Sequence, residues 1–401
     1  MCLILNIIAV AFFGEVEFWF ASIKILAIIG LIITGVVIFF GGAPTHDRLG
    51  FRYWQHPGAF NPYKVSGGTG RFLAFWYAFV RSGFSFILSP ELITTAAGEA
   101  EAPRRNIPKA TKRFVYRLIA FYVLGSLVIG VIVPYNDPKL LSAITKGESG
   151  AGASPFVIGV QNAGIHVLNH IVNAAILTSA WSSGNSWIFA GSRSLYSLAC
   201  NGQAPKIFRI CSKNGVPWVA VLATFAVSCL AYLNISTSGS TVFTWFTNLT
   251  TISGFIAWIV VMITYLVCIY PQSRTYTDPF QRFRKALEIN GLLHTLPFKT
   301  PLQPYATYYA LFLIIILTVT NSFHVFWSDE WSAANFLAAY ITIPAFLVLY
   351  LGHKAWFKTP WMTSIEKVDV VSGKAEIDRL EEMEGMPVPR NWIEKAWFWI
   401  A

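Results

Sequence analysis

Long apolar runs alternate with short polar gaps along most of this chain of 401 residues. A helix needs about 20 mostly apolar residues to cross the hydrocarbon core of a bilayer. The runs therefore predict an all-α polytopic membrane protein with about eight full transmembrane helices plus a partial one. The predicted helices are 1–13 (partial), 17–40, 72–98, 114–133, 167–198, 216–233, 242–266, 305–326 and 333–352. The polar remainder, 353–401, is predicted to form a tail.

The run over 72–98 contains residues that a passive span would avoid. Arg81 lies well inside it, and Pro90 and Glu91 lie deep in the apolar sequence. Proline removes a backbone donor and clashes with the preceding turn, so it breaks or kinks a helix. Broken helices and carboxylates at membrane depth are tolerated mainly where they line a cavity or a substrate path. The run therefore predicts a discontinuous helix at a transporter site, against the simpler alternative of a proline kink with a structurally paired glutamate.

Composition and charge narrow the class of protein. Only 12% of the residues are charged, against about 25% in soluble domains. The net charge of +10 could suggest a nucleic-acid partner. The basic residues instead cluster in alternate loops, at 104–117, 206–213 and 274–299, and in the tail. By the positive-inside rule these segments are cytoplasmic, so the charge is explained without nucleic acid and the C-terminus is predicted in the cytoplasm.

Signatures of enzymes and metal sites are missing from the sequence. The five cysteines form no Cys-x-x-Cys or Cys/His spacing, so no metal ligand set is predicted. Gly67-Gly68-Thr69-Gly70 has no predicted strand before it and is not a dinucleotide motif. We therefore expect neither an enzyme nor a bound cofactor.

Several longer motifs resemble one family. They are GEVEFWFASIK (14–24), GFRYWQHPGAF (50–60), AAGEAEAPRRNIPKA (96–110), VPYND (133–137), ASPFVIGVQNAG (153–164) and LQPYATYYALF (302–312). The chain resembles the fungal amino acid permeases of the amino acid–polyamine–organocation superfamily. The resemblance implies an inverted-repeat, LeuT-like fold and proton-coupled amino acid import by alternating access, most often at the plasma membrane. It also implies that the chain begins inside the family's fourth helix and lacks most of the first repeat.

The resemblance assigns the candidate residues on the broken helix. Glu91 stands where the family has an acidic residue implicated in substrate binding and gating, and Phe86, Ile87 and Ser89 would line the same pocket. The alternative for the last three is simple helix packing. Ser89-Pro90-Glu91 departs from the family, which has glycine in place of Ser89, so the local backbone and the substrate preference can differ.

Further candidates lie on two other spans. Lys24 stands where proton-coupled relatives have a lysine in place of the sodium ion of sodium-coupled ones, and it is the expected proton-coupling residue together with Glu91. Its alternative is a lysine whose ammonium reaches the interface. Trp181 and Ser182 lie on the counterpart of the family's helix eight, which faces the substrate; small polar residues there can equally serve helix packing.

Other interpretations stay open. The expected partners are an amino acid, protons, the bilayer and ubiquitin-ligase adaptors acting on the tail. A non-transporting nutrient sensor and a non-functional truncated permease are the alternative functions. Residues 267–281 begin with Val and end with Gln, whose codons can supply the GT and CAG that bound an intron, so this segment is interpreted as a retained intron translated in frame. The alternative is a genuine cytoplasmic loop. The closing residues 392–401 place their apolar side chains on one helical face, which predicts an interfacial helix or a frayed end.

Overall fold

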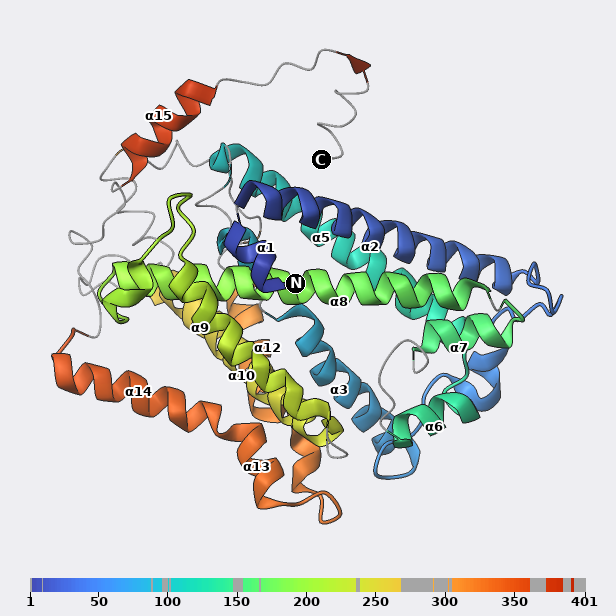
Figure 1. Cartoon of the computed structure of the whole chain (residues 1–401). Coiled ribbons are helices and arrows are strands. Elements are labelled where there is room, and N and C mark those ends of the chain that lie inside the picture. Colours follow the sequence, from blue (N-terminus) through green and yellow to red (C-terminus); the bar gives the residue numbers. More distant parts are fainter. Residues whose placement is uncertain are drawn as a thin grey trace. The chain divides into compact units, whose positions relative to one another are not determined.

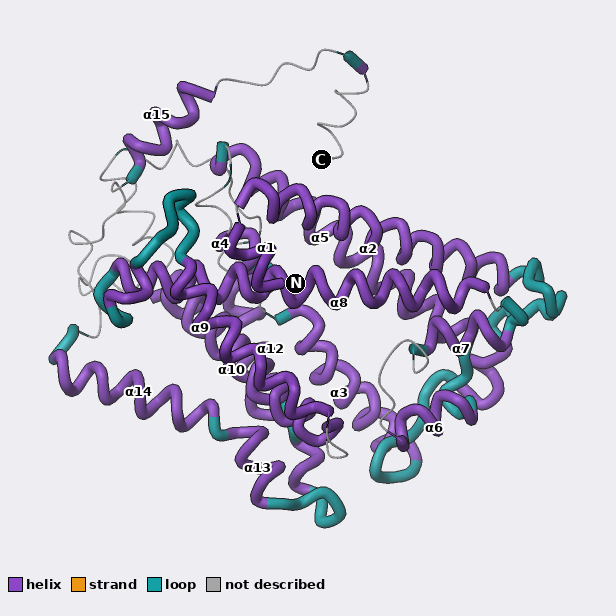
Figure 2. Tube along the Cα trace, viewed as in Figure 1, coloured by secondary structure: helices purple, strands orange, loops and turns teal. Residues whose placement is uncertain are grey.

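Helices make up most of the part of the chain that the computed structural model describes, and no strand occurs in that part (Figure 1, Figure 2). The described residues are 2–8, 10–87, 89–95, 100, 102–146, 154–165, 167–235, 239–267, 291, 302, 305–360, 373–384 and 391–392. The described residues do not include 268–281 or 393–401. The interpretation of 267–281 as a retained intron and that of 392–401 as an interfacial helix therefore stay predictions.

The α-helices of the described residues are α1 (Cys2–Ile8), α2 (Val10–Phe39), α3 (Gly67–Phe86), α4 (Glu91–Thr95), α5 (Pro103–Ile132), α6 (Pro138–Lys146), α7 (Pro155–Asn162), α8 (Val167–Cys200), α9 (Trp218–Ser228), α10 (Gly239–Val267), α12 (Tyr305–Thr320), α13 (Ala333–Tyr340), α14 (Thr342–Phe357) and α15 (Lys374–Glu384). Short helical turns are η1 (Trp54–Gly58), η4 (Lys206–Arg209), η5 (Cys229–Ile235) and η7 (Phe323–Phe326). They form two compact units. The first comprises Met1–Thr95, Thr111–Thr251 and Thr320–Ala339, and the second comprises Ala96–Ala110, Ile252–Val319 and Tyr340–Ala401.

Apolar composition makes this a multi-pass membrane protein, although fewer helices qualify than the eight predicted. Within the described residues, four segments are long and apolar enough to span: Gly14–Phe39, Gly67–Thr95, Pro103–Ile132 and Thr241–Thr264. A fifth is added if α13 and α14 count as one span. The helix α8 has 34 residues but carries many serines and asparagines, whereas α12 has only 16 residues. The predicted spans that do not qualify are therefore helices that are too short or too polar.

The start of α2 corrects a predicted boundary. The sequence predicts a polar break over residues 14–17 and a span that begins at residue 17, yet α2 runs unbroken from Val10 to Phe39. Glutamate is a good helix former and does not by itself end a helix, and within a membrane its side chain is tolerated when it finds a partner. Glu17 has such a partner, described below. The third predicted span, 114–133, likewise begins earlier, at Pro103, where proline fits the first helical turn.

The last predicted span, 333–352, is two helices in the structure. The helix α13 ends at Tyr340 and α14 begins at Thr342. Pro344 explains the break, because its ring would clash with the carbonyl of residue 340 and it has no N–H to donate. The seventh predicted span, 305–326, similarly divides into α12 and the turn η7.

The first unit is held together by helices packed along α2 and α8. The end of α2, the end of α5 and α7 share a buried apolar cluster that includes Ile38, Val128, Ile132 and Ile158. The helix α8 packs against α1, α2 and α9 and runs beside α2 (Figure 1). These contacts fix the two helices that carry the polar site described below.

Glycine allows α2 and α5 to approach each other closely at one point. A Cβ atom on Gly35 would lie 2.2 Å from Cγ1 of Val128, whereas one on Gly30 of the same helix would meet nothing within 4 Å. We expect Gly35→Ala to destabilise the protein by about 1–3 kcal/mol through overpacking. Gly30→Ala is the matched control and should leave stability nearly unchanged. Melting curves of the detergent-solubilised variants measure the difference, and equal melting temperatures would contradict this packing.

Candidate functional site

The helix break predicted around Pro90 lies between α3 and α4. The helix α3 ends at Phe86, Ile87 adopts an extended conformation with ψ of 141°, and α4 begins at Glu91. Proline disfavours helical backbone in the residue before it, so an interruption here follows from the sequence. The hydroxyls of Thr94 and Thr95 donate hydrogen bonds to the carbonyl of Glu91, at 2.8 and 2.9 Å. The short helix α4 is thus stabilised locally, and it packs against α8.

Lys24 and the end of α3 share a cavity. A cavity of about 370 Å³ is lined by Lys24 and Ile25 of α2, by residues of α5, and by Ser85, Phe86 and Ser89. Three sequence-predicted residues, Lys24, Phe86 and Ser89, therefore meet in one place. The Phe86 ring packs at 4.6 Å from the ring of Tyr122, measured between centroids.

Lys24 also lines a second, mostly apolar cavity. This one has a volume of about 420 Å³ and includes Ile28 of α2, Phe121 and Gly125 of α5, and Ser179 of α8. Tyr122 lines both cavities. Lys24 thus lines two cavities at once, one shared with the end of α3 and one with α8.

A directed chain of polar contacts joins α2 to α8 at Lys24. Its ammonium donates a hydrogen bond to Oγ of Ser182 at 2.6 Å, and the Ser182 hydroxyl in turn donates to Oε1 of Glu17. Lys24 Nζ lies 3.6 Å from the same carboxylate oxygen. Ser182 is fully buried, whereas the side chains of Lys24 and Glu17 are 32% and 25% exposed. The structure therefore brings Ser182 together with Lys24, as two residues of one polar group.

Four predicted residues, Glu91, Ile87, Trp181 and Ser182, line neither of the two cavities at Lys24. Of these, Ile87 is buried. The Trp181 ring packs on Phe20 at 5.1 Å between centroids, and its Nε1 is buried with no hydrogen-bond partner among the described residues. The geometry thus favours packing for Ile87.

Glu17 is the functional candidate that sequence reasoning missed. It was interpreted as part of a polar break, but it lies seven residues before Lys24 and therefore on the same face of α2. That i, i+7 spacing of opposite charges inside an apolar helix was the available signal. Among the described residues, no group of three histidines, cysteines or acids could hold a metal ion.

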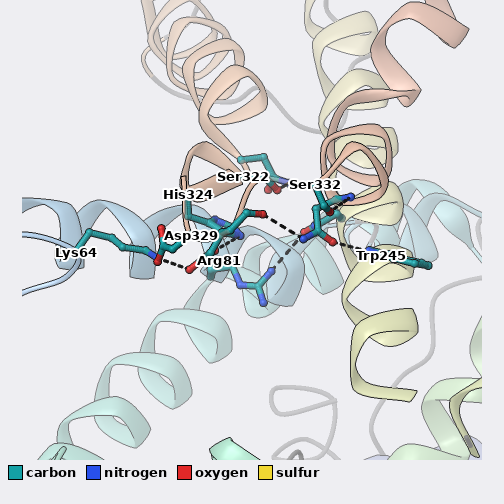
Figure 3. A network of polar contacts seen from close by, with 11 residues as sticks. Lys64, Arg81, Trp245, Ser322, His324, Asp329 and Ser332 are labelled. Carbon is teal, nitrogen blue, oxygen red and sulfur yellow. Dashed lines mark hydrogen bonds and ion pairs between the residues drawn. The ribbon is translucent and has the colours of Figure 1, made fainter. Parts of the chain in front are cut away.

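A second polar cluster joins two loops of the first unit (Figure 3). Lys64 Nζ lies 2.6 Å from Asp329 and 2.5 Å from Glu330, and its side chain is 13% exposed. Glu330 also lies 3.7 Å from Nε2 of His324, and Arg81 of α3 donates to Asn248 of α10 at 3.4 Å. A polar cavity of about 220 Å³ lies beside this cluster, lined by Trp245 and Asn335 among others. The paired charges hold the loop at residue 64 against the loop before α13.

The titration of these loop groups follows from their contacts. The hydrogen bond from Lys64 holds the pKa of Asp329 below its usual value, and the two carboxylates raise the pKa of Lys64. Burial, with the charge of Glu330, raises the pKa of Tyr63 to about 12. A carboxyl whose folded pKa is depressed stabilises the fold above its unfolded pKa of about 4, and the contribution is lost as pH falls through the folded value. The raised pKa of Lys64 has the opposite sense: its contribution is present below about pH 10 and is lost at higher pH.

We expect Lys64→Met to lower the melting temperature of the protein most between about pH 4 and pH 10, because it removes the ammonium that lies against both carboxylates. The matched control is Arg52→Met, which breaks the exposed pair of Arg52 and Asp47. Exposed pairs contribute about 0–1 kcal/mol, so this control should change little. The difference between Lys64→Met and wild type should shrink at acid pH; a difference that is independent of pH would contradict the ion-pair explanation.

Comparison with known proteins gives consistent results. The profile of the amino acid permease family matches residues 1–365. A proline-specific permease of Emericella nidulans is 63% identical over 99% of this chain and 70% of its own length. A proline-specific permease of Saccharomyces cerevisiae is 52% identical over 96% of this chain, and the dicarboxylic amino acid permease of that yeast is 40% identical over 94%. The chain spans 60% of the length of both yeast proteins.

Proposed function

Because this chain belongs to the amino acid permease family, we propose that it carries proline across a membrane together with protons. The proposed substrate rests on a comparison of sequence identities with relatives of different named substrates. Within one yeast, the proline-specific permease is 52% identical to this chain, whereas the dicarboxylic amino acid permease is 40% identical. Family members that share a substrate are expected to be more similar in sequence than members that carry different substrates.

The cavity at the broken helix suits such a substrate. Its lining includes Ala21, Phe86, Leu118 and Phe121, which can contact the apolar ring of proline. Ser89 offers a hydroxyl beside the end of α3, and Lys24 a positive charge that attracts the substrate carboxylate. Glu91 at the start of α4 is the proposed acid that responds to the substrate ammonium and to protons.

The proposed transport cycle is alternating access in an inverted-repeat, LeuT-like fold. The broken helix α3–α4 moves relative to α2 and α8, and Lys24 and Glu91 change protonation during the cycle. We place the protein in the plasma membrane with the tail 353–401 in the cytoplasm, where ubiquitin-ligase adaptors would act on it. In that tail, Asp378 of α15 pairs with Lys374 at 2.9 Å and with Arg104, which lower the pKa of its carboxyl.

Uptake of radiolabelled proline tests the proposal. The full chain is expressed in yeast cells that lack proline permeases, and uptake is measured with and without a proton gradient. We expect saturable uptake that falls when the gradient is collapsed. Excess unlabelled proline should compete at a concentration at least about tenfold lower than glutamate or lysine, a difference of about 1.4 kcal/mol in binding. Equal competition by lysine or glutamate would refute the substrate assignment, and no uptake at normal surface abundance would refute transport.

A further inference from the structure

We infer that Glu17, Ser182 and Lys24 form a proton relay in which Glu17 is the terminal acceptor and Ser182 the bridge. The inference rests on the proposed proton-coupled transport and assigns a role to a glutamate outside the broken helix. It starts from the direction of two hydrogen bonds. Lys24 donates to the oxygen of Ser182, and Ser182 donates its own proton to Glu17.

The directions of these bonds allow a balanced proton transfer. One N–H bond of the Lys24 ammonium breaks and an O–H bond to Ser182 forms, while the original O–H bond of Ser182 breaks and a new one forms at Oε1 of Glu17. The products are a neutral amine, an unchanged hydroxyl and a neutral carboxylic acid. No other reactant is needed, and the net charge of the group stays at zero.

Burial gives this transfer a driving force. Oε2 of Glu17 is buried and accepts no hydrogen bond from the described residues. A buried ionised oxygen without a partner is unfavourable, and the penalty grows as water leaves the site. Closing the two cavities at Lys24 would therefore favour the neutral pair, and reopening them would favour the ion pair. The relay thus links the protonation of Lys24 to access from the cavities.

Among the described residues, other charged or titratable groups lie on the elements around this chain of contacts. Arg117 and Tyr122 of α5 line cavities with Lys24, and Cys2 of α1 contacts the carbonyl of Trp181 at 3.9 Å. Glu91 belongs to α4, which packs on α8. Arg117 adds positive charge near the cavity, which favours release of the Lys24 proton toward Glu17. Lys24 and Glu17 are the two acid–base groups that the Ser182 hydroxyl bridges.

Separating exchange from accumulation tests the relay. Exchange of labelled for unlabelled proline across the membrane needs substrate binding and movement but no net proton transfer. Accumulation of proline against its gradient needs substrate binding and movement and, in addition, net proton transfer. In Glu17→Gln and Ser182→Ala we expect accumulation driven by a proton gradient to fall at least about tenfold and its dependence on external pH to flatten, while exchange stays within about threefold of wild type.

Two exposed neighbours provide matched controls. Glu15→Gln changes an exposed glutamate two residues before Glu17, and Ser183→Ala changes the exposed serine next to Ser182. Both should keep wild-type accumulation and pH dependence. Surface abundance is measured for every variant, and Glu17→Asp provides a second variant that keeps an acid if the glutamine variant folds poorly; it should retain part of the accumulation.

Three outcomes would overturn the relay. The first is wild-type accumulation and pH dependence in Glu17→Gln at normal abundance. The second is an equal loss of exchange and accumulation, which would make Glu17 a binding or structural residue. The third is a wild-type protein that exchanges proline without responding to protons; this result refutes the proton coupling of the proposed function as well, whereas the first two leave that function intact.

Discussion

Replacing Lys24 with methionine is expected to reduce proton-driven proline uptake by about 100-fold or more. Positioned proton-transfer groups contribute about 10²–10⁴ to the rates that depend on them. Lys24 lines both cavities of the site and is the donor at the start of the polar chain to Glu17. Uptake at several external pH values, normalised to surface abundance, measures the effect. Lys213→Met, at an exposed position in the loop after α8, is the matched control.

Arginine at position 24 separates charge from titration. Arginine keeps the positive charge but does not release its proton in proteins. If Lys24 exchanges a proton during transport, Lys24→Arg should be nearly as inactive as Lys24→Met. If it serves only as a counter-ion for Glu17, the arginine variant should keep most of the uptake, and that result would contradict a coupling role.

Glu91→Gln is expected to reduce uptake by about tenfold or more at unchanged abundance. Glutamine has nearly the same shape, so the break at Pro90 and the hydrogen bonds from Thr94 and Thr95 to the backbone should persist. The loss would therefore report the charge, because ionisable residues within membrane segments are retained mainly for function. A tail glutamate, changed in Glu376→Gln, is the control.

The alternative for Glu91 makes a distinct prediction. If its carboxylate only stabilises α4 against α8, Glu91→Gln should lower surface abundance or the melting temperature while each remaining molecule transports at the wild-type rate. Glu91→Asp adds to the distinction, since a shorter acid should recover part of the uptake only if the acid itself is required.

The long apolar runs predicted the helical membrane class, and proline chemistry explains the interruption between α3 and α4. These features depend on residues close in sequence. Helix boundaries were less predictable, because they depend on partners elsewhere in the chain. The polar residues at 14–17 predict a break in isolation, yet α2 continues through them, and the side chain of Glu17 accepts a hydrogen bond from Ser182, 165 residues away. The contact between Glu17 and Ser182 could not be predicted for the same reason, since the sequence near either residue does not show that they meet.

Only some of the predicted site residues line the cavities at Lys24. Phe86 and Ser89 were predicted to share a pocket and Lys24 was predicted separately, and the structure places all three around one cavity. Ile87 was assigned to the same pocket by its position beside Phe86. In the structure Ile87 has an extended backbone after α3, is buried, and does not line the cavities at Lys24.

The contact of Lys64 with Asp329 and Glu330 also restricts the topology of the chain. Two charged groups 2.6 Å apart lie on the same side of a hydrocarbon core about 30 Å thick. The chain must therefore cross the membrane an even number of times between residues 64 and 329. Three of the long apolar segments fall in this interval, Gly67–Thr95, Pro103–Ile132 and Thr241–Thr264, and three is odd. An even total therefore requires one or three further crossings. Among the described helices, α8, α9 with η5, and α12 are the candidates, and if all three cross the membrane the total is six.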